Sequence, residues 1–293
     1  MCRIVKLFQK TLLLLAASAS LVPISIYADS DLDGTIDATL QAGLEQSLKE
    51  IGLAREARKG NLAIALVDVS EAGKPRTAML NGHDMFYAAS LPKIAILLGA
   101  AVSLDNGSLP MSPALNKDIQ DMIRYSCNEC ASRVLEEVGR EKLISILQSP
   151  QYHFYDPEAG GGLWVGKPYG PESAYRRDPL AGFSHGATVF QAARFYYLLN
   201  EKTLVSPEQS EMMLSALSKP ALKHKFVKGL DAYDGLEIYR KSGTWKRSHA
   251  DSALVVSDQH RYIIVALAED REGSEWLEKL ATRLHLLVTA EDG

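Results

Sequence analysis

The chain has 293 residues, and its 32 basic and 36 acidic side chains leave a formal net charge of −4. This mild acidity argues against a protein that binds nucleic acid through a basic surface. The length and the 46% hydrophobic content favour a globular enzyme with a large core.

The first 28 residues are typical of a secretory signal peptide. Basic residues at Arg3, Lys6 and Lys10 precede an apolar run, no acidic residue occurs, and the segment ends at Ala28. Serines and a proline interrupt the apolar run, so we expect cleavage and no stable membrane insertion, with an uncleaved anchor as the alternative. We therefore expect a secreted or periplasmic monomer with one domain at residues 29–293.

The next segment predicts a helix followed by two strands. Apolar residues recur at helical spacing from Ile36 to Ile51, and a glycine follows directly. The apolar run Leu62–Asp68 predicts a strand, and a turn-like segment separates it from a second strand at Arg76–Leu80.

The middle of the chain, from residue 90 to about 218, gives mainly helical signals, at Glu129–Val138, Glu141–Leu147, Val189–Asn200 and Glu208–Leu217. Strand signals then return at Leu236–Ser242, Ser252–Ser257 and Tyr262–Ala268, before a last amphipathic helix around Trp276–Leu287. We therefore expect an α/β part from residues 29–89 and 219–293, with a helical part at residues 90–218 inserted between its halves.

Three short motifs occur in one order: Ser90-Leu91-Pro92-Lys93, Ser126-Cys127-Asn128 and Lys241-Ser242-Gly243-Thr244. A serine hydroxyl is a poor nucleophile at neutral pH and needs a base within hydrogen-bond reach. On a helix opening at Ser90, Lys93 would lie on the same face and reach it. Burial and a second cation, Lys241, would favour the neutral form of Lys93.

Each motif alone also has a structural interpretation. Ser90 and Ser126 could be helix N-caps, Lys93 a surface lysine, Asn128 a turn residue and the third motif a strand end. The ordered triple favours catalysis, because three such matches in one chain are far more specific than one.

The triple resembles the catalytic set of the penicillin-recognising serine hydrolases, and the order of elements is similar to class A serine β-lactamases and the related D,D-peptidases. The resemblance implies an α+β fold with an antiparallel five-stranded sheet, flanking N- and C-terminal helices and an inserted all-α subdomain. It implies acylation at Ser90, with Lys93 as base or proton relay and Ser126 passing the proton to the departing nitrogen.

The resemblance also implies the substrate contacts. Lys241 and Thr244 would hold the substrate carboxylate. The backbone N–H groups of Ser90 and Thr244 would form the oxyanion hole, and Asn128 would contact the substrate amide. The other substrate-binding positions on this strand would be Ser242 and Gly243.

The residue for deacylation departs from the family pattern. Class A enzymes activate the hydrolytic water with a glutamate in a Glu-Pro-Glu-like loop, and the nearest match here is Asp156-Pro157-Glu158. Asp156 is the aligned candidate base and Glu158 its neighbour, and an exposed turn carboxylate is the alternative for each. The glycine-rich segment at residues 160–170 then predicts either a rim of the site or a packed surface loop.

Cys127 and Cys130 flank the second motif, and Cys127 stands where class A enzymes usually carry aspartate. Their spacing at a helix start permits a disulfide in an oxidising compartment, while two small buried thiols are an equal alternative. Two cysteines without a nearby histidine make only half a zinc site, so no metal is expected.

A rival motif, Gly182-Phe183-Ser184-His185-Gly186, matches the Gly-x-Ser-x-Gly nucleophile elbow. The elbow needs a buried strand before the serine, but residues 175–181 are polar and contain a proline. We therefore assign Ser184 to the loop and cap that lead into the helix from Ala187.

The sequence as a whole predicts an exported serine hydrolase of the β-lactamase type, which opens a β-lactam amide through an acyl-enzyme on Ser90. The first alternative is a D,D-peptidase-like hydrolase with slow deacylation that acts on a peptidoglycan stem peptide. The second is a non-catalytic binding protein, although the intact Ser/Lys/Ser/Lys set argues against it. No cofactor is expected in any of the three.

Overall fold

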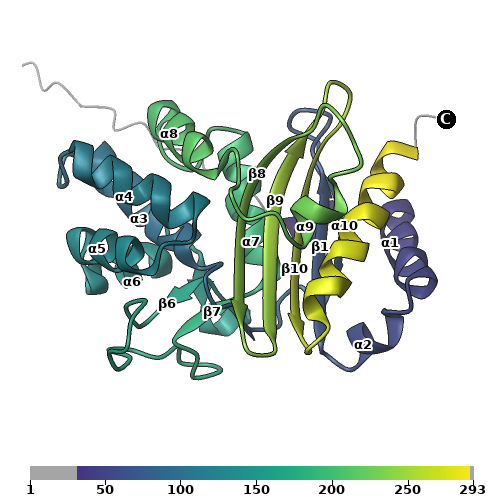
Figure 1. Cartoon of the computed structure of the whole chain (residues 1–293), viewed down its shortest axis with the longest axis horizontal. Coiled ribbons are helices and arrows are strands. Elements are labelled where there is room, and N and C mark those ends of the chain that lie inside the picture. The colour runs from purple at the N-terminus through teal and green to yellow at the C-terminus, as the bar shows by residue number, and fades with distance from the viewer. Residues whose placement is uncertain (1–31, 291–293) are drawn as a thin grey trace, which may run out of the picture.

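The computed structural model describes residues 32–290, so the predicted signal peptide lies outside the described residues. Figure 1 shows a central sheet, with helices α1 and α10 on one side and a helical part on the other. The predicted α+β class is confirmed by this arrangement. Within the described residues, no helix is both long and apolar enough to span a bilayer.

The main sheet has five antiparallel strands in the order β2-β1-β10-β9-β8. Its strands are β1 (Leu62–Asp68), β2 (Arg76–Leu80), β8 (Glu237–Trp245), β9 (Ser248–Val256) and β10 (Arg261–Glu269). The early strand β1 pairs with the last strand β10, with Ala65 opposite Val265. Both ends of the chain therefore build the sheet, as the sequence predicted, and β8 is left as an edge strand.

One face of the sheet is covered by α1 (Ala38–Glu50), α2 (Ala54–Arg58), α9 (Phe226–Gly229) and α10 (Gly273–Thr289). Side chains alternate along β1, so Leu62, Ile64 and Leu66 pack under α1 and α10, whereas the smaller Ala63 and Ala65 face the helical part. The first helix starts two residues later than its apolar periodicity suggests.

The late start of α1 has a local cause. Asp37 caps the helix by accepting a hydrogen bond from the Leu40 amide at 2.8 Å. Ile36 instead bridges to Thr77 of β2 and is 47% exposed.

The helical part consists of α3 (Lys93–Asp105), α4 (Pro113–Arg124), α5 (Asn128–Val138), α6 (Arg140–Gln148), α7 (Val189–Asn200) and α8 (Pro207–Leu217). α3 is buried without interruption from Lys93 to Ser103 and forms the centre of this part. α7 packs against the sheet. α4 was not predicted, although Ser112 and Pro113 form a typical helix start.

Short strands connect the two parts, and the sequence did not predict them. β3 (Phe86–Tyr87), β7 (His185–Ala187) and β6 (Trp164–Val165) form a small sheet in the order β3-β7-β6. This sheet brings the glycine-rich segment at residues 160–170 beside the residues that precede Ser90.

Candidate active site

Ser90 lies in a turn between β3 and α3, and α3 begins three residues later at Lys93. The expectation that Ser90 opens the helix was wrong. Hydrogen bonds from the Leu91 amide to Ala88 O and from the Lys93 amide to Ser90 O are turn bonds between residues three apart. Pro92 has no N–H to donate, so the regular helical ladder starts only beyond it.

The Lys93 ammonium is bound by the second motif. Its side chain is fully buried, and Nζ donates to Ser126 O at 2.6 Å and to Asn128 Oδ1 at 2.8 Å. Cys127 O and Ser126 Oγ lie 3.3 Å from Nζ. The predicted direct reach of Lys93 to Ser90 is not observed, because none of the hydrogen bonds among residues 32–290 joins their side chains.

Ser126 lies between two lysines. Its hydroxyl is 2.9 Å from Lys241 Nζ and 3.3 Å from Lys93 Nζ. Burial lowers the pKa of Lys93 to about 7. Burial, and then the charge of Lys93, hold the pKa of Lys241 well below its usual value. Two lysines with lowered pKa values that share one hydroxyl can pass a proton between them.

A cleft of about 170 Å³ opens beside these groups. Each motif contributes one lining residue, namely Ser90, Asn128 and Thr244, and residues 167–170 form another wall. Part of the glycine-rich segment is therefore a rim of the site. Among residues 32–290, no Asp or Glu lines this cleft.

A comparison of the sequence with known families identifies the family of this chain. Residues 113–287 match the model of the β-lactamase enzyme family. The chain belongs to the β-lactamase enzyme family. It is thus a serine β-lactamase-like hydrolase. No curated protein matches it in sequence.

Solved structures of β-lactamases and related proteins share the fold. A β-lactamase from Sphaerobacter thermophilus aligns with a TM-score of 0.64 at 17% identity, covering 85% of this chain and 95% of that one. PBP-A aligns with a TM-score of 0.65 at 16% identity, covering 87% and 97%. A class A β-lactamase from Bacteroides cellulosilyticus aligns with a TM-score of 0.64 at 15% identity, covering 86% and 98%.

In this β-lactamase-like hydrolase, Tyr169 joins the site without having been predicted. Its ring centre lies 4.5 Å from Lys93 Nζ and 4.2 Å from the ring of His185. Its hydroxyl donates to Ala89 O at 3.2 Å, next to Ser90. The only sequence signal was an aromatic residue within the glycine-rich segment, which does not by itself predict contact with Lys93.

His185 packs against Tyr169 and is neutral. Burial lowers its pKa to about 4, and its Nε2 lies 2.9 Å from Lys167 O. Ser184 precedes the short strand β7, and Thr188 is the residue that caps α7. Ser184 thus follows no buried strand, and the rejection of the nucleophile-elbow motif is confirmed.

Asp156 and Glu158, the predicted candidates for deacylation, do not line the cleft. Asp156 Oδ1 accepts from the Glu158 amide at 2.8 Å, and Oδ2 lies 2.9 Å from His153 Nε2, which lowers the pKa of Asp156. Glu158 is exposed. β4 (Tyr155–Asp156) folds back onto β5 (Gly161–Gly162), so these carboxylates sit in a turn before the chain reaches the cleft.

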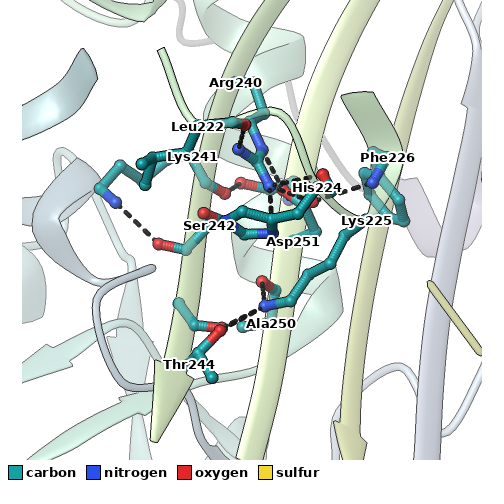
Figure 2. A network of polar contacts seen from close by, with 12 residues as sticks. Leu222, His224, Lys225, Phe226, Arg240, Lys241, Ser242, Thr244, Ala250 and Asp251 are labelled. Atoms are coloured by element: carbon teal, nitrogen blue, oxygen red, sulfur yellow. Dashed lines mark hydrogen bonds and ion pairs between the residues drawn. The ribbon is translucent and has the colours of Figure 1, made fainter. Parts of the chain in front are cut away.

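A buried polar network supports the third motif from behind the strand (Figure 2). Arg240 donates to both oxygens of Asp251, each at 2.7 Å. Lys225 Nζ donates to Gly243 O at 2.6 Å and to Thr244 Oγ1 at 2.8 Å. The sequence did not predict this network, because Lys225 and Asp251 lie in no motif. Arg240 meets Asp251 only when β8 pairs with β9, and Lys225 reaches Gly243 from the turn before α9.

The remaining features concern cysteines and metals. Cys127 and Cys130 form a disulfide, so of the two alternatives that the sequence left open the disulfide is the one observed. Between residues 32 and 290, no group of three or more His, Cys, Asp or Glu side chains is arranged to hold a metal ion.

A larger cavity of about 460 Å³ lies at the start of β8, and none of the motif residues lines it.

Proposed function

We propose that this serine β-lactamase-like hydrolase opens the amide of a β-lactam through an acyl-enzyme on Ser90. The observation that carries the proposal is the position of the Ser126 hydroxyl, 2.9 Å from Lys241 Nζ and 3.3 Å from Lys93 Nζ. This group lies beside the cleft that Ser90 and Thr244 line. The cleft thus combines a nucleophile, a lysine base and a proton relay.

The chemistry then follows from the residues. Neutral Lys93, whose Nζ now binds Ser126 and Asn128, must turn toward Ser90 when substrate binds, and it then takes the proton of the Ser90 hydroxyl as that oxygen attacks the lactam carbonyl. The backbone N–H groups of Ser90 and Thr244 stabilise the oxyanion. When the C–N bond breaks, Ser126 gives its proton to the departing nitrogen and recovers one from Lys93 or Lys241. Lys241 attracts the substrate carboxylate, and Asn128 contacts the substrate amide. The Thr244 hydroxyl accepts from Lys225 Nζ at 2.8 Å, which leaves its own proton to donate to that carboxylate.

The release step separates this function from a second candidate. Fast hydrolysis of the ester needs a base within reach of a water molecule, and no Asp or Glu of the described part of the chain lines the cleft. This favours a D,D-peptidase-like hydrolase that acts on peptidoglycan stem peptides and releases penicillins slowly. A variant of PBP-A, which shares the fold, is described as an acyl-enzyme complex with penicillin G.

Export is part of the proposal. Residues 1–28 have the composition of a signal peptide, and a disulfide is typical of proteins in an oxidising compartment. The location is tested by fractionating expressing cells and sequencing the N-terminus of the product. A mature chain that begins near Asp29 in the periplasm or the medium supports export.

The proposed function is tested by intact-mass spectrometry of the mature chain incubated with benzylpenicillin and sampled over time. We expect one adduct, absent from Ser90→Ala and retained by the matched control Ser184→Ala. Adduct formation that persists in Ser90→Ala, or is lost in Ser184→Ala, would contradict the assignment. Adduct lifetimes in Asp156→Asn and Glu158→Gln should equal the native one, and a longer lifetime in either would return that carboxylate to the mechanism.

A further inference from the structure

The disulfide lies inside the catalytic motif. Cys127 is the central residue of Ser126-Cys127-Asn128, and Cys130 lies in the first turn of α5. The two Cα atoms are 5.3 Å apart, and the closed ring contains Asn128. The bond is thus covalently part of the segment that binds Lys93.

This segment supplies every hydrogen-bond acceptor found for Lys93 among the described residues. They are two main-chain carbonyls and two side chains, namely Ser126 O, Cys127 O, Ser126 Oγ and Asn128 Oδ1. Ser126 has a φ of +59°, a left-handed conformation that costs a non-glycine residue about 1–3 kcal/mol. A strained turn keeps its shape only when its surroundings hold it, and the disulfide is the nearest covalent restraint.

The two sulfurs differ in access and in charge. Cys127 is half-buried, whereas Cys130 is 4% exposed. Arg133 Nη2 lies 3.5 Å from Cys130 Sγ, although it also binds Asp118, and Glu129 Oε2 lies 4.0 Å from Cys127 Sγ. The Cys130 amide also donates to Cys127 Sγ at 3.1 Å, so charge alone does not separate the two sulfurs. Access does, because an incoming thiolate reaches the half-buried Cys127, and the Arg133 guanidinium stabilises the Cys130 thiolate that leaves.

We propose that the Cys127–Cys130 disulfide is a thiol-exchange site that controls acylation by holding the acceptors of Lys93, an inference that rests on the proposed function. The partner is a dithiol reductant. One of its thiolates attacks Cys127 Sγ, forms a mixed disulfide and releases the Cys130 thiolate, which takes up a proton. The second thiol of the reductant then displaces Cys127 as its thiol, and the reductant leaves as a disulfide. Reduction frees the turn and slows acylation.

The test compares the rate of Ser90 acylation by benzylpenicillin in three states of the mature chain: oxidised, reduced with dithiothreitol and then desalted, and reoxidised. We expect about tenfold slower acylation after reduction, because small misplacements of a catalytic group have effects of this size or larger. Reoxidation should restore the rate. Alkylation and mass spectrometry count the free thiols in each state.

A matched control and a second measurement separate positioning from stability. The double variant Cys127→Ser with Cys130→Ser should acylate slowly and ignore the reductant, which excludes effects at other sites. Its acylation rate should also show a shifted pH midpoint, because Lys93 loses ordered acceptors. Mere loss of folded protein would lower the labelled fraction and leave that midpoint unchanged.

The outcomes are distinguishable. Equal acylation rates and pH midpoints in the oxidised and reduced chains, with free thiols confirmed, would overturn this inference and leave the proposed function standing. Free thiols in the chain after oxidation would do the same. A lack of Ser90 labelling in the oxidised chain would overturn both.

Discussion

Two groups of buried cations lie at strand β8, and they differ in whether a carboxylate balances their charge. On the cleft side, Lys93 and Lys241 donate only to carbonyl, hydroxyl and amide oxygens, and no carboxylate among residues 32–290 forms an ion pair with either. Behind the strand, Arg240 forms a two-bonded ion pair with Asp251. Arg240 and Lys241 are neighbours in sequence, so their side chains leave the strand on opposite faces.

The difference teaches which cations serve the fold and which serve the chemistry. A buried cation with a carboxylate partner stays charged and fixes geometry. A buried lysine without one is driven toward its neutral form, and burial lowers the pKa of Lys93 to about 7. Lys225 is intermediate, because burial lowers its pKa to about 8 while the charge of Asp251 opposes that shift.

The largest expected effect on acylation comes from replacing Lys93, a buried cation without an ion pair. Lys93→Met should lower the acylation rate by about 10²–10⁴-fold, the usual contribution of a general base. Its free energy of unfolding should change by less than about 2 kcal/mol, because the gain from removing a buried cation without an ion pair offsets the loss of its hydrogen bonds. Stopped-flow acylation and urea denaturation measure the two quantities. A marked loss of stability would place Lys93 with the structural cations.

Asp251→Asn tests the other side of the comparison. It leaves Arg240 buried without a counter-charge, and the free energy of unfolding should fall by about 3–5 kcal/mol. Asp270→Asn is the control, because the contact of Asp270 with Arg247 at 3.5 Å is partly exposed and an asparagine can still accept the hydrogen bond from the Glu272 amide. It should change stability by less than about 1 kcal/mol. Equal effects of the two variants would mean that the buried pair contributes little.

Lys241→Ala sharpens the assignment of the second lysine. A hydrogen bond to a charged group contributes about 1.5–3 kcal/mol, so acylation efficiency toward a substrate with a carboxylate should fall about 10- to 150-fold. With a matched substrate in which an ester replaces the carboxylate, Lys241→Ala and the native chain should have similar acylation efficiency. An equal loss with both substrates would contradict the carboxylate role and favour the proton relay.

The pH dependence follows from the unpaired lysines. Only neutral Lys93 can act as the base, so the acylation rate should rise with pH to a plateau, with a midpoint near its pKa of about 7. Stability should change in the same direction. Between pH 7 and about 9.5 the unfolded chain still holds the proton that folded Lys93 has released, so the free energy of unfolding rises with pH. A rate midpoint near 10, the range of an ordinary lysine, would contradict the lowered pKa of Lys93, and a rate that does not change with pH would exclude Lys93 as the base.

The smallest effect is expected at the rim. Lys167 lines the cleft, and no ion pair of its side chain is found among the described residues. Lys167→Glu should reduce acylation by an anionic penicillin about two- to fivefold, in keeping with a partly exposed charge, and added salt should remove the difference. Lys279→Glu on α10, which makes the same change in net charge away from the cleft, should have no such effect.

The sequence by itself determined the candidate site residues and the framework. The three motifs placed Ser90, Asn128 and Thr244 in one cleft, and hydrophobic periodicity placed β1, β2 and α7 within their observed bounds. These features depend on residue type and local spacing, which a sequence displays directly. The predicted start of α3 at Ser90 was wrong. Pro92 has no N–H to donate, so the helix begins at Lys93, directly after the proline.

Only the tertiary structure decided what surrounds the reacting groups. Tyr169 reaches Lys93 because β6 and β7 pair, and Asp156 remains outside the cleft because β4 folds back onto β5. Arg240 meets Asp251 only through the register of β8 on β9, where Ser242 pairs with Asp251. Strand pairing joins residues that are distant in sequence, and a lysine pKa depends on the burial and charges that such pairing creates.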